Sequence, residues 1–143
     1  MIVLDANVLL YAYDADASHH AAARKWLEQA VAGPESIGIP WLGLWAFVRV
    51  STNSRLHAAP LAVTDAFQIV RTFLAHPNVN VVEPGPRHAE ILERLTATYQ
   101  ATGPLLTDAA LAAIALEQGA TLASADRGFA RFTELRWVNP LAA

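Results

Sequence analysis

The chain alternates short apolar runs with longer segments in which apolar side chains recur every three or four residues. The runs have the length of buried strands, and the periodic segments have the spacing of amphipathic helices. Strands are predicted at residues 1–4, 36–39, 79–82, 121–124 and 135–138. Helices are predicted at residues 7–13, 18–32, 41–50, 64–74, 87–99 and 107–118, with a helical turn at 129–132. This alternation predicts an α/β fold: a three-layer α/β/α sandwich around a central, mainly parallel sheet.

Residues that favour helix ends mark several of these boundaries. Ser18 is a favourable N-cap, and Pro40 suits the start of the helix that follows it. Gly33 and Gly119 suit the residues at which helices end. No low-complexity linker or internal repeat divides the 143 residues, a length that suits one domain. We therefore expect a single domain over residues 1–143.

The segment at residues 41–50 is apolar nearly all round, so we expect it to be buried or to face a partner. Trp41, Trp45 and Phe47 fit core packing or a protein interface better than stacking on unpaired bases. The whole chain is 54% hydrophobic and only 16% charged, which exceeds the apolar content of an average domain. We therefore expect another chain to cover part of the surface, in a homodimer or with a protein partner.

Composition also narrows the location and the class of protein. The chain has no cysteine, which fits a reducing cytoplasm. We find no signal peptide and no apolar stretch of the ~20 residues needed to span a bilayer. The net charge of −3 argues against a general nucleic-acid coat protein but leaves nucleic-acid enzymes open. Nine of the ten basic residues are arginines, and Arg49, Arg55 and Arg127 are candidates for phosphate contacts or for solvated surface.

Three aspartates each stand where a predicted strand ends or a predicted helix begins. Asp5 follows the first strand, Asp126 follows the fourth, and Asp108 follows Thr107 at the head of a helix. Taken singly, each is explained as a cap or turn residue, with Thr107 as the N-cap before Asp108. In an open parallel sheet, however, Asp5 and Asp126 fall at the carboxyl edge where ligands bind, and helix starts such as that at Asp108 also face this edge. The spacing therefore permits the three to converge but does not require it. Clustered carboxylates there would suit Mg²⁺ or Mn²⁺, which prefer oxygen ligands.

Several segments resemble PIN domains of the VapC toxin type, in order along essentially the whole chain. They are IVLDANVLLYA at residues 2–12, LTDAALAAIA at 106–115, GATLASADRGF at 119–129 and FTELRWVNP at 132–140. The resemblance implies a Mg²⁺- or Mn²⁺-dependent endoribonuclease, the toxin of a type II toxin–antitoxin system, with RNA as substrate and a cognate antitoxin as partner. By position, Asp5, Asp108 and Asp126 match the catalytic metal-binding acids, with Asn7 and Ser124 as polar neighbours.

Two positions depart from the family pattern. Ala46, in Ala46-Phe47-Val48-Arg49, stands where the family commonly has a glutamate, and Gly128 stands where it often has a further aspartate. Three interpretations remain open: weaker metal binding, replacement by another acid, or a misread register. The candidate replacements are Asp14, Asp16 and Glu83.

Two alternative functions follow from the same residues. A haloacid-dehalogenase-like phosphatase also places an aspartate after its first strand. That chemistry needs a second aspartate two residues later and a distant lysine, whereas this chain has Asn7 and the single lysine Lys25. The other alternative is a catalytically weakened or silent PIN domain that binds protein or RNA, which the alanine at position 46 favours.

Overall fold

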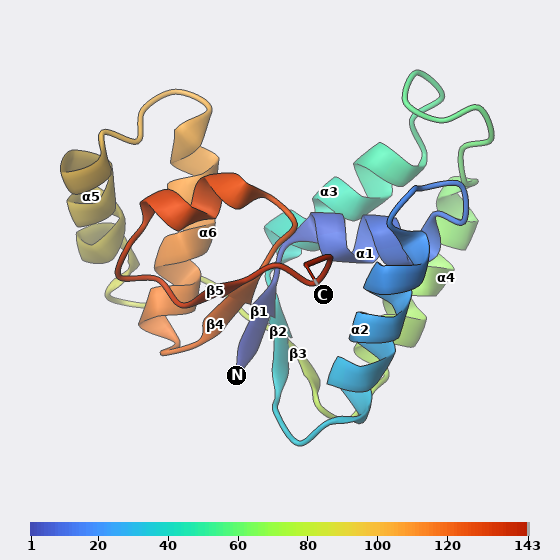
Figure 1. Ribbon diagram of the computed structural model, residues 1–143, viewed down its shortest axis with the longest axis horizontal. Coiled ribbons are helices and arrows are strands. Elements are labelled where there is room, and N and C mark those ends of the chain that lie inside the picture. The colour runs from blue at the N-terminus through green and yellow to red at the C-terminus, as the bar shows by residue number, and fades with distance from the viewer. Residues whose placement is uncertain (143) are drawn as a thin grey trace.

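The computed structural model describes residues 1–142, which build a five-stranded sheet in the order β3-β2-β1-β4-β5 (Figure 1). Every neighbouring pair of strands is parallel. The strands are β1 (Ile2–Leu4), β2 (Ile37–Ile39), β3 (Val79–Val81), β4 (Thr121–Ala123) and β5 (Trp137–Val138). The sheet therefore confirms the predicted parallel α/β architecture.

Helices fill the connections between the strands. They are α1 (Ala6–Tyr13), α2 (His20–Ala32), α3 (Trp41–Ser51), α4 (Val63–Leu74), α5 (His88–Tyr99), α6 (Leu105–Glu117) and the short 3-10 helix η1 (Arg127–Arg131). Each connection carries the chain from the end of one parallel strand back to the start of the next, which requires a crossover of this kind. All of the predicted helices are present among the described residues.

The hydrophobic core consists of two layers, one on each face of the sheet. Consecutive strand residues point to opposite faces, so Val3 packs with α5 and α6 while Leu4 packs with α1 to α4. Leu122 and Ala123 divide in the same way on β4. The two groups of helices flank the sheet in Figure 1, as the three-layer sandwich predicts.

Two helix starts differ from the prediction. Ser18 lies in a turn, and α2 begins at His20 without a side-chain cap. Helix α6 begins at Leu105 after Pro104, so Thr107 lies in the first turn and is not the N-cap. Pro104 already has helical dihedral angles (φ −59°, ψ −26°), and its missing N–H is no loss at a helix start, so the helix begins there.

The aromatic segment of α3 has a buried and an exposed side. Phe47 is 1% exposed and belongs to the core, whereas Trp45 is 63% exposed and Trp41 36% exposed. The predicted core position is therefore confirmed for Phe47, whereas Trp41 and Trp45 lie outside the core. Within residues 1–142, no helix has both the length and the apolar character needed to cross a bilayer.

Candidate active site

The first two site residues lie where the order of the strands reverses. From β1 the chain continues to β2 on one side, and from β4 it continues to β5 on the other. In open parallel sheets, the loops that leave such a point diverge and open a crevice at the carboxyl ends of the strands. Asp5 follows β1 directly and Ser124 follows β4, and the Asp5 N–H donates to Ala123 O at 3.0 Å across the two strands. The sheet thus brings together residues that are 119 positions apart.

A hydrogen-bond network fixes the orientation of the Asp5 carboxylate. The fully buried Ser124 hydroxyl donates to Asp5 Oδ2 at 2.7 Å and accepts the Asp126 N–H at 3.0 Å. The Asn7 amide donates to Asp5 Oδ2 at 3.2 Å and lies 3.1 Å from Ser124 Oγ, while its Oδ1 accepts the Ala125 N–H at 3.1 Å. Asn7 and Ser124 are therefore the polar neighbours of the acid, at the positions predicted for them.

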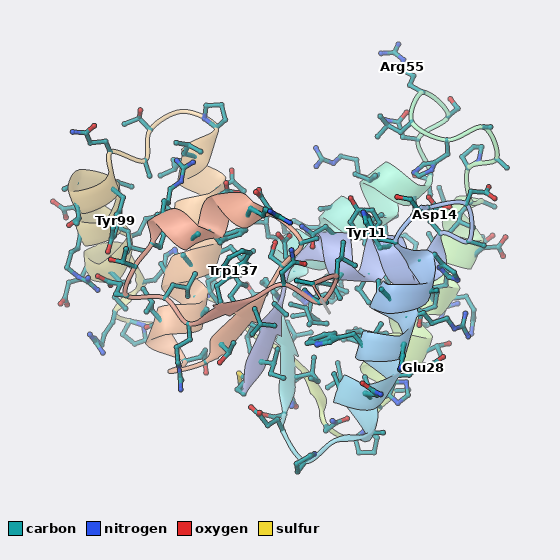
Figure 2. All side chains as sticks on the ribbon, viewed as in Figure 1. Tyr11, Asp14, Glu28, Arg55, Tyr99 and Trp137 are labelled. Atoms are coloured by element: carbon teal, nitrogen blue, oxygen red, sulfur yellow. The ribbon has the colours of Figure 1, made fainter. Side chains whose placement is uncertain are left out.

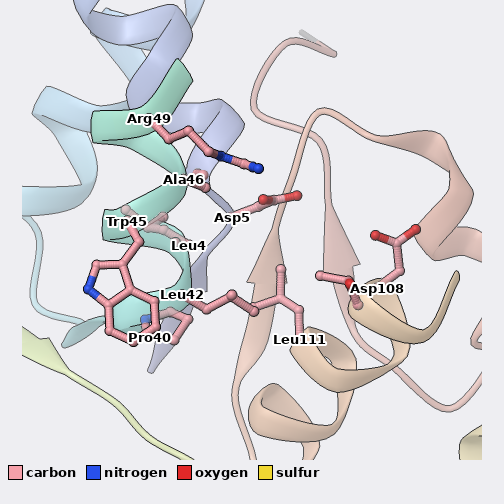
Figure 3. Close-up of a pocket in the computed structure, with 12 residues that line it drawn as sticks. Leu4, Asp5, Pro40, Leu42, Trp45, Ala46, Arg49, Asp108 and Leu111 are labelled. Carbon is pink, nitrogen blue, oxygen red and sulfur yellow. The ribbon is translucent and has the colours of Figure 1, made fainter. Parts of the chain in front are cut away.

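A cleft of about 510 Å³ opens above the end of β1, between α3 and α6. Asp5 lines it from β1 and Asp108 from the first turn of α6, and their carboxylates extend toward the same space (Figure 3). Thr107 also lines the cleft, from the first turn of α6. Sequence reasoning treated Thr107 as a cap and so missed this position.

The three aspartates influence one another electrostatically. Burial raises the pKa of Asp5 above its ordinary value, and the nearby charge of Asp126 adds to that increase despite the hydrogen bond from Ser124. Burial also raises the pKa of Asp108, followed by the charges of Asp126 and Asp5, while Arg131 opposes these effects. The three carboxylates are therefore near enough for their charges to interact, although only Asp5 and Asp108 line the cleft. Arg131 is a further neighbour that no sequence signal indicated.

Besides its electrostatic effect on Asp5 and Asp108, Asp126 has a local structural role. Its Oδ1 accepts the Gly128 N–H at 2.8 Å, which caps the start of η1. A Cβ at position 128 would lie 3.0 Å from that same oxygen, so any side chain there would press on the carboxylate. Glycine at this departure from the family pattern thus allows Asp126 its present geometry.

The donor set suits a hydrated divalent cation better than a closed protein cage. Within residues 1–142, no three His, Cys, Asp or Glu side chains converge closely enough to enclose a metal ion by themselves. Mg²⁺, however, keeps several water ligands and is commonly held by one or two carboxylates. Asp5 and Asp108 supply two carboxylates to one cleft, and their raised pKa values show that their charge is not fully compensated.

None of the three candidate acids replaces the missing glutamate. Ala46 lines the cleft from α3, so the position itself faces the site. The Glu83 carboxylate accepts the backbone N–H of Trp41 at 3.1 Å, at the first residue of α3. Asp14 and Asp16 line a different cavity beside His57. Among the described residues, the α3 wall of the cleft therefore carries no carboxylate.

The three candidate arginines lie in different environments. Arg49 lines the cleft from α3 and extends toward Asp5 (Figure 3). Arg55 lies at the tip of the loop after α3 and extends away from the protein (Figure 2), while Arg127 lines a shallow hollow next to Trp137. Only Arg49 of these three lies in the cleft.

The parallel α/β fold of this chain is found in a known class of protein. The model of the PIN domain family matches residues 2–135, and the chain belongs to this family. Within it, the chain is similar to ribonuclease VapC43 of Mycobacterium tuberculosis, with 45% identity over 141 residues, 99% of this chain and 96% of that protein. Ribonuclease VapC37 of the same organism is 43% identical, in an alignment that covers 99% of each chain. The predicted resemblance to VapC-type PIN domains is therefore confirmed.

Solved structures show the same fold at lower sequence identity. VapBC2 from Rickettsia felis, bound to a promoter DNA fragment, matches with a TM-score of 0.68 and 20% identity over 97% of this chain and 98% of its own. VapC20 of Mycobacterium tuberculosis, described as a sarcin-ricin loop cleaving toxin, matches with a TM-score of 0.65 and 15% identity. The match covers 91% of this chain and 93% of VapC20.

The raised pKa of Asp5 predicts how the metal-free protein responds to pH. Because the folded-state value lies above the ordinary 3.8, this group favours folding at low pH, and the contribution is lost as pH rises through the folded-state pKa. The free energy of unfolding of the wild type should therefore decrease relative to that of Asp5→Asn over this range. Urea unfolding in EDTA at a series of pH values measures the difference. A stability difference between the wild type and Asp5→Asn that stays constant with pH would contradict this prediction. The control is Asp65→Asn, which removes an exposed carboxylate from α4.

Proposed function

We propose that this protein is a metal-dependent endoribonuclease and the toxin of a type II toxin–antitoxin pair. The observation that carries the proposal is the pair of carboxylates, Asp5 and Asp108, on two walls of one cleft at the switch point of the sheet. It is supported by 40–45% identity over almost the full chain to proteins named VapC ribonucleases.

The cleft supplies the parts that metal-assisted phosphodiester hydrolysis requires. Asp5 and Asp108 would hold Mg²⁺ or Mn²⁺, with Asp126 at the edge of the site. When bound, such an ion increases the acidity of water and stabilises negative charge on a phosphoryl oxygen. The chain's own part is positional: Ser124 and Asn7 hold the Asp5 carboxylate in one orientation, so it need not reorganise when the substrate enters.

The alternative of a silent binding module has less support. All three aspartates are present, and Asp5 remains in its hydrogen-bond network although burial disfavours its ionised form. An ionisable side chain in a cleft whose pKa is shifted by burial and by a neighbouring charge is typical of a functional site. We expect Ala46 to weaken metal binding without abolishing it.

A cognate antitoxin is the proposed protein partner. Several of the matching structures are toxin–antitoxin complexes, including one from Klebsiella pneumoniae and a DNA-bound VapBC from Salmonella typhimurium. A second chain, either an antitoxin or a second copy in a homodimer, would cover exposed apolar side chains such as Leu56 and Leu106. Cleavage of RNA in the cytoplasm is the activity that the antitoxin would restrain.

Metal-dependent cleavage of RNA is the direct test of this function. The purified, antitoxin-free protein should cut single-stranded RNA internally in Mg²⁺ or Mn²⁺, and excess EDTA should abolish cutting, because the chemical step would then lack the cation that stabilises charge on the phosphoryl oxygen. Gel analysis of an end-labelled transcript measures both. A stable protein that leaves several unrelated transcripts and total RNA intact in either metal would overturn the proposal.

A further inference from the structure

A second hollow, of about 210 Å³, lies on the outer side of α3, where this helix packs against α4. Helix α3 contributes Trp41, Trp45 and Arg49 to its lining, and α4 contributes Phe67 and Val70. Apart from Arg49, every side chain that lines this groove is aliphatic or aromatic. The α3–α4 groove is therefore an apolar depression with a single cation at its margin.

The aromatic rings of the groove are not needed to fill the core. Trp45 is 63% exposed, Phe67 41% and Trp41 36%, while Phe47 on the inner face of α3 is 1% exposed. Exposed rings of this size on one small surface indicate a binding site, because they would otherwise leave a large apolar area in water. Tryptophan also presents a flat face on which another ring stacks.

The groove is continuous with the acidic cleft. Trp45 and Arg49 line both of them and lie four residues apart on α3, so they occupy neighbouring turns of the same helix face. Among residues 1–142, no carboxylate forms an ion pair with Arg49, although the other wall of the cleft is acidic. In Figure 3 the Arg49 side chain extends toward Asp5, and the Trp45 indole points away from Asp5.

We infer that the α3–α4 groove binds a nucleobase of single-stranded RNA next to the phosphate that is cut. Arg49 holds a backbone phosphate at the margin of the cleft, and the Trp45 indole stacks on the adjacent base. This inference rests on the proposed ribonuclease function and names how the same site holds its substrate.

The combination of chemical groups favours RNA over an apolar protein segment as the occupant. Arg49 and Trp45 line both the acidic cleft and the groove, so a guanidinium and an indole lie where the two hollows meet. A single strand presents phosphates next to bases, and single-strand binding sites commonly combine cationic groups with stacking rings. An apolar peptide would fill the groove but would leave Arg49 without a partner.

Binding of RNA without cleavage tests the groove directly. A short fluorescent oligoadenylate is titrated in EDTA against the wild type, Trp45→Phe, Trp45→Leu and Arg49→Ala. We expect Trp45→Leu to bind roughly 5- to 150-fold more weakly, because an aliphatic side chain cannot stack, and Trp45→Phe to retain most of the affinity. Arg49→Ala should reduce the slope of log K against log salt by about 0.7, the value for one phosphate contact on a single strand. Arg55→Ala and Leu56→Ala are exposed-loop controls that should match the wild type.

Cleavage in Mg²⁺ or Mn²⁺ separates a failure of this inference from a failure of the proposed function. If the wild type does not cut RNA, the proposed function fails first. If the wild type cuts RNA and Trp45→Leu has unchanged affinity and KM, the inference is overturned. Light scattering of the same variants tests whether a protein occupies the groove instead. If Trp45→Leu loses homodimer formation or antitoxin binding but keeps its RNA affinity, the groove is a protein interface. That result would also overturn the inference.

Discussion

Asp108→Asn and Asp5→Asn should each reduce kcat/KM for RNA cleavage by at least about 100-fold, since even outer-shell partners of metal sites commonly contribute 10–100-fold. Asparagine keeps the shape and one acceptor oxygen of each side chain, so the Ser124 hydroxyl still has its partner at position 5. What is lost is the negative charge that would hold the cation. Initial rates on an end-labelled RNA, at saturating Mn²⁺ and over a range of RNA concentrations, measure the effect.

The matched control for these variants is Asp65→Asn, which removes one carboxylate from the exposed first turn of α4. It should cut RNA at the wild-type rate. In addition, the metal-free Asp5→Asn protein should be at least as stable as the wild type at neutral pH, since the charge it removes is disfavoured by burial. Folded Asp5→Asn and Asp108→Asn proteins that both retain wild-type cleavage would exclude these aspartates as the metal-binding acids.

The fold was predictable from the sequence because its signals are local and repeated. Apolar runs such as residues 1–4 are too short for helices, and their alternation with amphipathic segments requires parallel pairing. Parallel pairing then places the strand ends at one edge, which is why Asp5 and Asp126 were expected to meet. The order of the strands was not predictable, because it depends on which face of the sheet each crossover covers.

The finer parts of the site depend on tertiary packing and carry no clear sequence signal. Thr107 lines the cleft from the first turn of α6, whereas its residue type and position suggested a helix cap. Arg131, the last residue of η1, acts on the charge of Asp108 although the two residues are 23 positions apart in the sequence. The separation of Trp45 from Phe47 depends on which face of α3 meets the core, and a helix that is apolar nearly all round does not reveal that face.

Ala46→Glu should strengthen metal binding, lowering the Kd for Mn²⁺ by about tenfold or more, because affinity for hard cations increases with the number of charged ligands. Position 46 lines the cleft of about 510 Å³ from α3, on the wall that carries no carboxylate among the described residues. The same substitution should destabilise the metal-free protein at neutral pH. A further negative charge beside Asp5 disfavours the ionised form of that carboxyl group, whose pKa burial already raises. Calorimetric titration and thermal unfolding, each with and without Mn²⁺, measure the two effects.

Ala46→Gln is the control, because glutamine has the volume of glutamate without its charge. If charge is what the α3 wall lacks, the glutamate variant alone should gain Mn²⁺ affinity, and Mn²⁺ should raise its melting temperature more than that of the wild type. Equal Mn²⁺ affinities for the two variants would show that position 46 does not reach the cation, and the site would then be complete with Asp5, Asp108 and Asp126. A gain in Mn²⁺ affinity for the glutamate variant alone would instead identify the wild-type chain as a PIN domain with a weakened metal site. In that site, Arg49 is the only charged side chain of α3 that lines the cleft.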